Sequence, residues 1–282
     1  MLVSPEALSQ SLAGAGAAGL PVIFDCRFDL GDPDAGRRAW RTGRLPGAVY
    51  AHLDDDLAAP VTPATGRHPL PDAAGFAAFL ARSGWSPGRD IVAYDAQGGA
   101  FAARLWWLMR YFGHDCVTLL DGGWPAWVEA GLPVETGEPG VPESAPLTAL
   151  EARQGMTLDA GQVAAGLSNG SVLLVDARAP DRFAGRNETI DPVAGHVPGA
   201  VNLPFAGNLD QGRFRSADAL AARFDEVLQG RDAGATVHMC GSGVTACHNL
   251  FAMALAGSGD ARLYPGSWSE WIRDPARPVA AG

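Results

Sequence analysis

The sequence predicts an α/β protein made of two similar domains, each a mostly parallel sheet with helices on both faces. Three observations predict this fold class. The length of 282 residues suits two domains of ordinary size. One series of sequence landmarks occurs twice in the same order, and within each copy short apolar runs alternate with helical stretches. Alternating strands and helices form parallel sheets that are covered on both faces.

The internal repeat consists of landmarks that keep their order with only small changes in spacing. The pairs are VIFDCR (22–27) with LLVDAR (173–178), GRLPGAVY (43–50) with GHVPGAVN (195–202), IVAYD (91–95) with TVHMC (236–240), and DGGWPAW (121–127) with YPGSWSEW (264–271). Chance resemblance would not preserve such a series, so the sequence indicates a duplicated unit.

Each copy supplies both strand and helix candidates. The strand candidates are short apolar runs of the buried, parallel-sheet type, at 22–25, 48–50, 91–94, 117–121, 173–176, 200–203, 236–239 and 261–264. The helical stretches are 72–84, 101–113, 217–230 and 247–257. A stretch rich in Pro, Gly and Glu lies between the copies. We therefore expect a domain at 1–134, a linker at 135–154 and a second domain at 155–282.

Composition excludes several classes of function. The net charge of −10 argues against a surface for nucleic acid or anionic membrane, because phosphate binding needs clustered Lys and Arg. No apolar run is long enough to span a bilayer, and the first residues lack the features of a secretion signal. We expect a cytoplasmic protein. The cysteines at 26, 116, 240 and 247 form no Cys-x2-Cys pair, so no metal site is expected.

The loop after Cys240 is the strongest candidate for chemistry. An apolar strand ends at Cys240, and the residues GSGVTA (241–246) lead into a helical stretch. Sites in open α/β sheets form beyond the carboxyl ends of strands. Glycines let successive N–H groups turn inward, and these dipoles and the following helix stabilise a thiolate, the nucleophilic form of cysteine. The sequence therefore predicts Cys240 as a nucleophile and the other three cysteines as packing residues.

A cysteine in a strand-to-helix loop also suggests a tyrosine-phosphatase-like enzyme. That chemistry needs an arginine six residues after the cysteine to hold the phosphate. Position 246 is Ala, so phosphatase activity is rejected as the main function.

The loop CGSGVTAC, the duplicated unit, DAR (176–178), GHVPGAVN (195–202) and GSWSEW (266–271) together resemble the two-domain rhodanese-type sulfurtransferases. The resemblance covers essentially the whole chain. It implies tandem rhodanese-like domains, the first without a catalytic cysteine, and Asp95 stands at that position here. It also implies that Cys240 attacks the donor sulfur and carries it as a persulfide without a metal or organic cofactor. The loop residues that would cradle the outer sulfur are Gly241, Gly243, Val244 and Thr245.

The resemblance also implies where the donor's anionic end binds. Arg182 matches the arginine that holds the substrate carboxylate or sulfonate, and a guanidinium fork suits that task. Enzymes of the mercaptopyruvate type usually carry a second arginine about nine residues later. Asp191 stands there in this chain, and Arg186 is the candidate to replace the missing arginine.

A proton relay is the last feature that the resemblance implies. Its members match Ser242, His68 and Asp54. His68 and Asp54 lie in the first half of the chain, so we expect a site in the cleft between the domains.

The Gly-Ser-Gly loop looks like the mercaptopyruvate type, since thiosulfate enzymes typically carry basic residues there. We therefore expect 3-mercaptopyruvate as the small-molecule donor and a thiol acceptor such as a thioredoxin-like protein or a small dithiol. Two alternatives stay open. They are a thiosulfate sulfurtransferase, and a non-catalytic sulfur-carrier or regulatory module that binds a partner protein.

Overall fold

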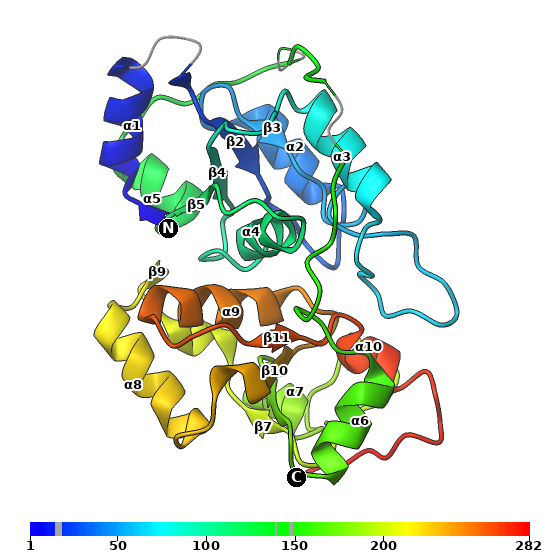
Figure 1. The fold of residues 1–282 in the computed structure, drawn as a ribbon. Coiled ribbons are helices and arrows are strands. Elements are labelled where there is room, and N and C mark those ends of the chain that lie inside the picture. Colours follow the sequence, from blue (N-terminus) through cyan, green and yellow to red (C-terminus); the bar gives the residue numbers. More distant parts are fainter. Residues whose placement is uncertain (15–18, 139, 141, 147–148) are drawn as a thin grey trace. The chain divides into compact units, whose positions relative to one another are not determined.

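The computed structural model describes residues 1–14, 19–138, 140, 142–146 and 149–282, and it divides the chain into two units (Figure 1). Unit 1 comprises Met1–Ala59 and Pro71–Arg153, and unit 2 comprises Pro60–Leu70 and Gln154–Gly282. The predicted linker at 135–154 is thus grouped almost entirely with unit 1. The segment 60–70, from the first half of the sequence, is grouped with unit 2.

The described part of unit 1 contains a parallel sheet of five strands in the order β1-β5-β4-β2-β3. The strands are β1 (Leu2–Val3), β2 (Val22–Asp25), β3 (Val49–Tyr50), β4 (Ile91–Tyr94) and β5 (Val117–Leu120). Strands β2 and β4 are buried along their whole length, as expected for continuous apolar runs in a parallel sheet.

Helices cover both faces of this sheet. The described helices of unit 1 are α1 (Pro5–Gly14), α2 (Ala35–Thr42), α3 (Ala73–Arg82), α4 (Ala102–Tyr111) and α5 (Gly123–Glu129). Leu8 of α1 and Trp127 of α5 pack in one cluster with Ile23 of β2. Phe24, the next residue of β2, points the other way and lies 5.3 Å from Phe79 of α3 between ring centroids. Neighbouring strand residues therefore serve opposite faces.

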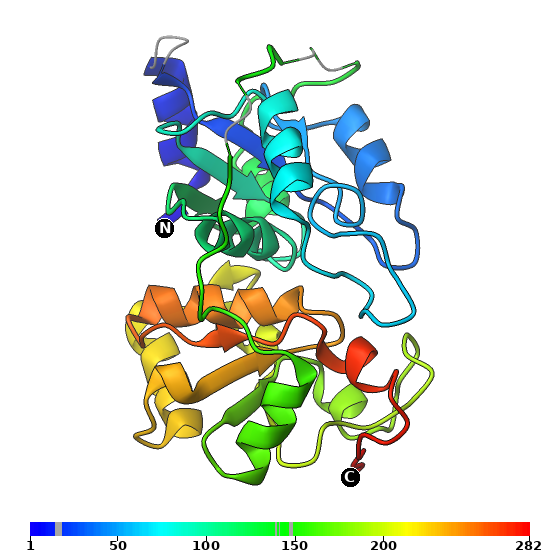
Figure 2. The same ribbon diagram turned by 45° about the vertical axis from the view of Figure 1, so that its right-hand side comes forward.

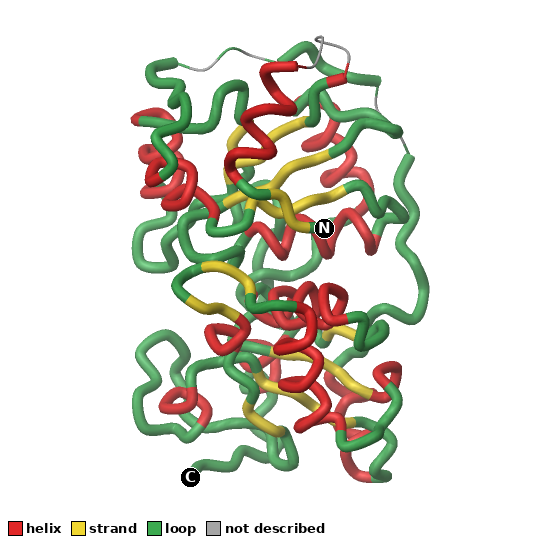
Figure 3. Tube along the Cα trace, turned by 90° about the vertical axis from the view of Figure 1, so that its left-hand side faces the viewer, coloured by secondary structure: helices red, strands yellow, loops and turns green. Residues whose placement is uncertain are grey.

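Unit 2 repeats this arrangement with a sheet in the order β11-β10-β6-β7, again parallel. Its strands are β6 (Leu173–Asp176), β7 (Val201–Asn202), β10 (Thr236–Met239) and β11 (Arg262–Leu263). Figure 3 shows the strands of each unit side by side. Together with the helices, these sheets confirm the predicted α/β class.

The helices of unit 2 also occupy both faces of its sheet, as Figures 1 and 2 show. One buried cluster joins Val163 of α6 and Trp268 of α10 to Leu174 of β6, and another joins Phe224 of α8 and Met253 of α9 to β6. The helices are α6 (Ala160–Ser168), α7 (Pro180–Phe183), α8 (Ala217–Leu228), α9 (Thr245–Ala256) and α10 (Ser267–Trp271), with 3-10 turns at Phe205–Asn208 and Ala233–Ala235. A capping box of Asp159 and Gln162 begins α6.

A small antiparallel hairpin was not predicted from the sequence. It pairs β8 (Leu209–Asp210) with β9 (Arg213–Phe214). Its turn residues Gln211 and Gly212 both have positive φ, at 49° and 78°, which matches the twist of a two-residue hairpin turn. Strands this short carry no readable alternation of apolar and polar residues.

A buried arginine joins three of the repeat landmarks in unit 1. Arg27 Nη2 pairs with Asp25 at 2.5 Å and donates to the Gly43 carbonyl at 2.6 Å. Its guanidinium also lies over the Trp124 ring, 4.5 Å from the centroid. Landmarks that are distant in sequence therefore meet at one side chain.

Unit 2 contains the same arrangement around Arg178. Its Nη2 pairs with Asp176 at 2.7 Å and donates to the Gly195 carbonyl at 2.9 Å. The guanidinium lies 4.8 Å from the Trp268 ring centroid. The shared contacts explain why these motifs recur, since each pair of carboxylate and guanidinium is buried and depends on the other group.

Within the described ranges, no helix combines the length and the apolar character needed to cross a lipid bilayer.

Candidate active site

Cys240 directly follows β10, at the carboxyl end of a central strand of the unit 2 sheet. It is only 2 % exposed. The Gly243 N–H donates to Cys240 Sγ at 3.2 Å, and the Cys240 N–H donates to Ser267 Oγ at 3.1 Å. The loop residues therefore turn a backbone donor toward the sulfur, as an anion nest requires.

Contacts with α10 and with Pro265, just before that helix, fix the shape of this loop. The Trp268 N–H donates to the Cys240 carbonyl at 3.0 Å, and the Ser269 N–H donates to the Gly241 carbonyl at 2.9 Å. Gly243 has a φ of +78°, and a Cβ there would lie 2.4 Å from the Pro265 carbonyl oxygen. Only glycine fits this position without moving the backbone.

The corresponding loop of unit 1 encloses an anion of its own. The Asp95 side chain is buried, and its two carboxylate oxygens accept four backbone N–H groups. The donors are Gln97 at 2.8 Å and Gly99 at 2.9 Å to Oδ1, and Phe101 at 2.8 Å and Ala102 at 2.9 Å to Oδ2. The strand-to-helix loop of unit 1 therefore directs four backbone N–H groups at one carboxylate, that of Asp95.

Ser242 and His68 lie together beside the Cys240 loop. His68 Nδ1 is 2.6 Å from Ser242 Oγ, and both side chains are buried. The sequence predicted this pair for a relay, and the structure brings the two groups into hydrogen-bond contact. An imidazole bonded to a hydroxyl can pass a proton. Asp54 belongs to unit 1, where its backbone N–H donates to His52 Nδ1 at 3.2 Å, so its part in the relay stays a prediction.

The segment 60–70 that carries His68 is attached to unit 2 by a close backbone approach. A Cβ on Gly66 would lie 2.5 Å from the Gly266 carbonyl oxygen, so glycine permits the contact. The next N–H, that of Arg67, donates to Ser269 Oγ at 3.0 Å. This contact places the Arg67 side chain near the loop.

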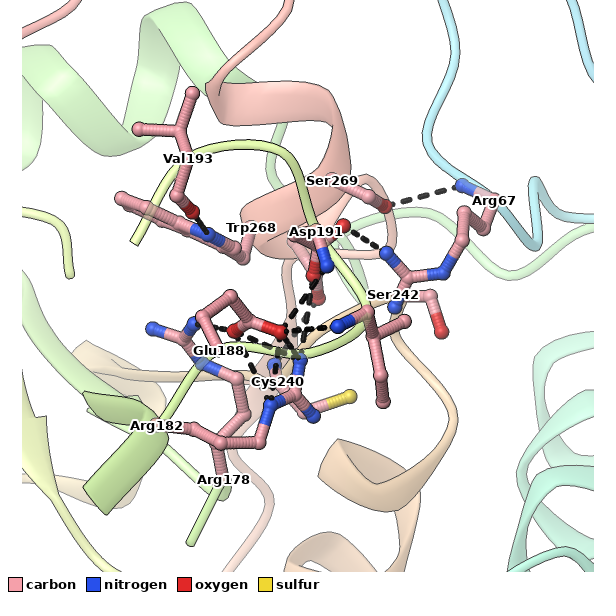
Figure 4. Close-up of polar contacts among 12 residues, drawn as sticks. Arg67, Arg178, Arg182, Glu188, Asp191, Val193, Cys240, Ser242, Trp268 and Ser269 are labelled. Atoms are coloured by element: carbon pink, nitrogen blue, oxygen red, sulfur yellow. Dashed lines mark hydrogen bonds and ion pairs between the residues drawn. The ribbon is translucent and has the colours of Figure 1, made fainter. Parts of the chain in front are cut away.

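Arg182 forms a fork with a buried carboxylate (Figure 4). Its Nε lies 3.1 Å from Glu188 Oε2 and its Nη2 lies 2.9 Å from Glu188 Oε1. Nη2 also contacts Asp191 Oδ2 at 3.3 Å. Burial opposes ionisation of Glu188, but hydrogen bonds from Arg182 and from backbone N–H groups together hold the pKa of Glu188 below its usual value.

Arg67 is a further candidate for the site that no sequence pattern indicated. Its Nη1 forms an ion pair with Asp191 Oδ1, opposite the Asp191 oxygen that contacts Arg182. Burial raises the pKa of Asp191, and the Arg67 charge opposes that rise. The available signal in the sequence was an Asp where an arginine was expected, because a carboxylate in a site for an anionic donor needs a compensating cation. Arg186 is exposed, and no contact in the described part of the chain joins its guanidinium to the loop.

Both guanidinium groups reach the first residue after Cys240. A Cβ on Gly241 would lie 2.9 Å from Arg67 Nη2 and 3.6 Å from Arg182 Nη2. The described site therefore combines a thiol, a hydroxyl bonded to an imidazole, and two cations. This set of groups suits a nucleophilic attack on an anionic substrate.

The remaining cysteines have no comparable surroundings. Cys26 and Cys247 are buried and Cys116 is half-buried. Burial raises the pKa of Cys26 well above its usual value and also raises the pKa of Cys116. Cys247 Sγ donates to the Gly243 carbonyl at 3.3 Å. In the described ranges, no group of three His, Cys, Asp or Glu side chains could hold a metal ion.

Comparison with known proteins gives consistent matches over the whole chain. The pattern of the rhodanese-like domain matches residues 4–130 and 159–274. A probable 3-mercaptopyruvate sulfurtransferase of Pseudomonas aeruginosa is 49 % identical over 268 residues, covering 93 % of this chain and 92 % of the relative. A putative thiosulfate sulfurtransferase, SseB, of Mycobacterium tuberculosis is 44 % identical over 278 residues, covering 96 % and 95 %.

Solved structures agree with these matches. The 3-mercaptopyruvate sulfurtransferase from Leishmania major superposes with a TM-score of 0.85 at 31 % identity, over 98 % of this chain and 75 % of that one.

Proposed function

This chain belongs to the rhodanese family of sulfurtransferases, and on that premise we propose that it moves sulfur from 3-mercaptopyruvate to a thiol or cyanide through a persulfide on Cys240. The supporting observation is the Gly243 N–H aimed at Cys240 Sγ, at 3.2 Å, in a loop whose unit 1 counterpart binds a carboxylate through four N–H groups. A loop of this kind stabilises the negative charge of a thiolate and of the outer persulfide sulfur.

The proposed first step transfers one sulfur atom and one proton. The Cys240 thiolate attacks the thiol sulfur of the donor, so an S–S bond forms and the donor C–S bond breaks. The electron pair of the broken bond remains on the donor carbon, which leaves as the enolate of pyruvate. The proton of the donor thiol moves to that carbon, and the Ser242–His68 pair, 2.6 Å apart, is suited to carry it.

Charge at the site supports 3-mercaptopyruvate as the donor. The loop residues Gly241 to Gly243 carry no charge. Arg67 and Arg182 stand beside them, but both already pair with buried Asp191 and Glu188. A nearly neutral cluster accepts one carboxylate more readily than the dianion of thiosulfate.

Thiosulfate is the second candidate donor, favoured by the two guanidinium groups beside Gly241. A thiol acceptor, as a thioredoxin-like protein or a small dithiol, and a cytoplasmic location complete the proposal.

The deciding experiment compares steady-state rates with 3-mercaptopyruvate and thiosulfate, each with cyanide and with a dithiol as acceptor. We expect kcat/KM for 3-mercaptopyruvate to exceed that for thiosulfate by about tenfold or more, as one unfavourable charge at an effective dielectric of about 20 implies. A faster reaction with thiosulfate at matched sub-saturating concentrations would show that thiosulfate, and not 3-mercaptopyruvate, is the preferred donor. Absence of turnover with every donor and acceptor would favour a non-catalytic carrier module.

A further inference from the structure

One edge of the Arg67 guanidinium, formed by Nε and Nη2, donates no hydrogen bond to the residues that the structure describes. Nη1 pairs with Asp191, whereas Nε is buried and has no hydrogen-bond partner among the described residues. Nη2 is the atom nearest Gly241, at 2.9 Å from the position of a Cβ there. Buried donors are nearly always satisfied in proteins, so an unsatisfied one calls for a ligand or another explanation. Nε and Nη2 form the edge that binds a carboxylate with two parallel hydrogen bonds.

Arg182 offers a further donor at the same place. Its Nε and Nη2 are taken by Glu188, but in the described part of the chain Nη1 enters no ion pair. That nitrogen lies 3.8 Å from the same point beside Gly241. The side chains of Arg67 and Arg182 are 26 % and 19 % exposed, so a ligand can approach them. A carboxylate on the Arg67 edge requires the guanidinium to turn so that the buried Nε is uncovered.

The charges around these donors are balanced. The cations Arg67, Arg178 and Arg182 face the carboxylates Asp176, Glu188 and Asp191 through the ion pairs already described and through a further one, between Arg178 Nη1 and Glu188 Oε2 at 3.4 Å. An incoming anion is therefore attracted by directed N–H groups more than by net charge. A planar carboxylate matches such a fork better than a tetrahedral dianion.

We propose that Arg67 binds the carboxylate of an α-keto acid donor through its Nε and Nη2 edge, with Arg182 Nη1 as an additional donor. The assignment rests on the proposed function for the identity of the donor. It places the carboxylate next to Gly241, one residue from the reacting sulfur of Cys240. It also gives the segment 60–70 a role in substrate recognition, in addition to the proposed role of His68 in the proton relay.

The kinetic test compares two donors that differ only in the carboxylate. Mercaptoacetone keeps the ketone and the thiol of 3-mercaptopyruvate but lacks its carboxylate. We expect Arg67→Ala to lower kcat/KM about 10- to 100-fold with 3-mercaptopyruvate and less than about threefold with mercaptoacetone. Arg67→Lys should recover only part of the loss, because an ammonium has no fork. Equal losses with both donors would overturn the inference, as would unchanged kinetics.

A binding test separates this inference from the proposed function. Pyruvate serves as a non-reacting probe for Cys240→Ser protein in isothermal titration calorimetry. Adding Arg67→Ala should weaken its binding at least about tenfold, whereas Arg273→Ala, which removes an exposed arginine of the same unit, should leave it unchanged. An affinity for pyruvate that Arg67→Ala does not change, or no pyruvate binding at all, would refute the carboxylate site. Arg67-dependent binding without any turnover of 3-mercaptopyruvate would support the site and reject the proposed function.

Discussion

Replacing Asp95 by alanine tests whether the strand-to-helix loop is a built anion site. The substitution removes the acceptor of four backbone N–H groups, those of Gln97, Gly99, Phe101 and Ala102, of which the last three are buried. No other part of unit 1 is changed. The space left behind is the size of a carboxylate and is lined by N–H donors.

The expected loss of stability follows from those four hydrogen bonds. Each bond to a charged group contributes about 1.5–3 kcal/mol, but burial of the carboxylate offsets part of the sum. Leaving these donors without an acceptor should therefore lower the free energy of unfolding by about 3–5 kcal/mol. For a unit of this size, each kcal/mol shifts the melting temperature by about 2–4 °C, so Asp95→Ala should lower it by about 10 °C.

Differential scanning calorimetry measures this shift, with Asp90→Ala as an exposed control in the same unit. Formate, which can occupy the vacated nest, should raise the melting temperature of the Asp95→Ala protein more than that of the wild type. A drop of less than about 2 °C, or no difference in the response to formate, would refute the anion-site interpretation of both loops.

Three further predictions concern unit 2. Gly243→Ala should abolish sulfur transfer, because the added Cβ would meet the Pro265 carbonyl at 2.4 Å, and retained kcat/KM would contradict this. Ser242→Ala should lower kcat by about 100-fold or more with 3-mercaptopyruvate but much less with thiosulfate, which has no thiol proton, so equal effects on both rates would reject the relay. Burial lowers the pKa of His238 from 6.5 to about 3, so below about pH 6.5 the unfolded chain binds a proton that the folded chain excludes. Urea unfolding should therefore show the free energy of unfolding falling by about 1.4 kcal/mol per pH unit from pH 6 to pH 4. His238→Leu should remove this contribution to the slope, and an unchanged slope would show that another group takes up the proton.

The fold could be predicted because its signals are local and occur twice. Continuous apolar runs predicted β2, β4, β6 and β10, and each is now seen in a parallel sheet. The hairpin of β8 and β9 was missed because two-residue strands with a Gln-Gly turn carry no periodic pattern. The grouping of residues 60–70 with unit 2 depends on a close approach at Gly66, which only the folded chain reveals.

In the candidate site, too, residues that are neighbours in the sequence could be predicted, whereas contacts between distant residues could not. The Cys240 loop was predicted from a strand end, two glycines and a following helix, which are neighbours in the sequence. Arg67 was missed because its partner Asp191 lies 124 positions away, and no local pattern connects them. Asp191 attracted notice as a departure from the family pattern, but only the folded chain shows which cation compensates for it.

The most direct test of the account is the location of the transferred sulfur. The protein is incubated with 3-mercaptopyruvate, freed of excess donor and examined by tandem mass spectrometry, which separates Cys240 from Cys247 within one peptide. The account predicts one added sulfur atom on Cys240, none on Cys26, Cys116 or Cys247, and no label in Cys240→Ser protein. Sulfur on another cysteine at an equal level, or full transfer activity in Cys240→Ser, would contradict the persulfide mechanism.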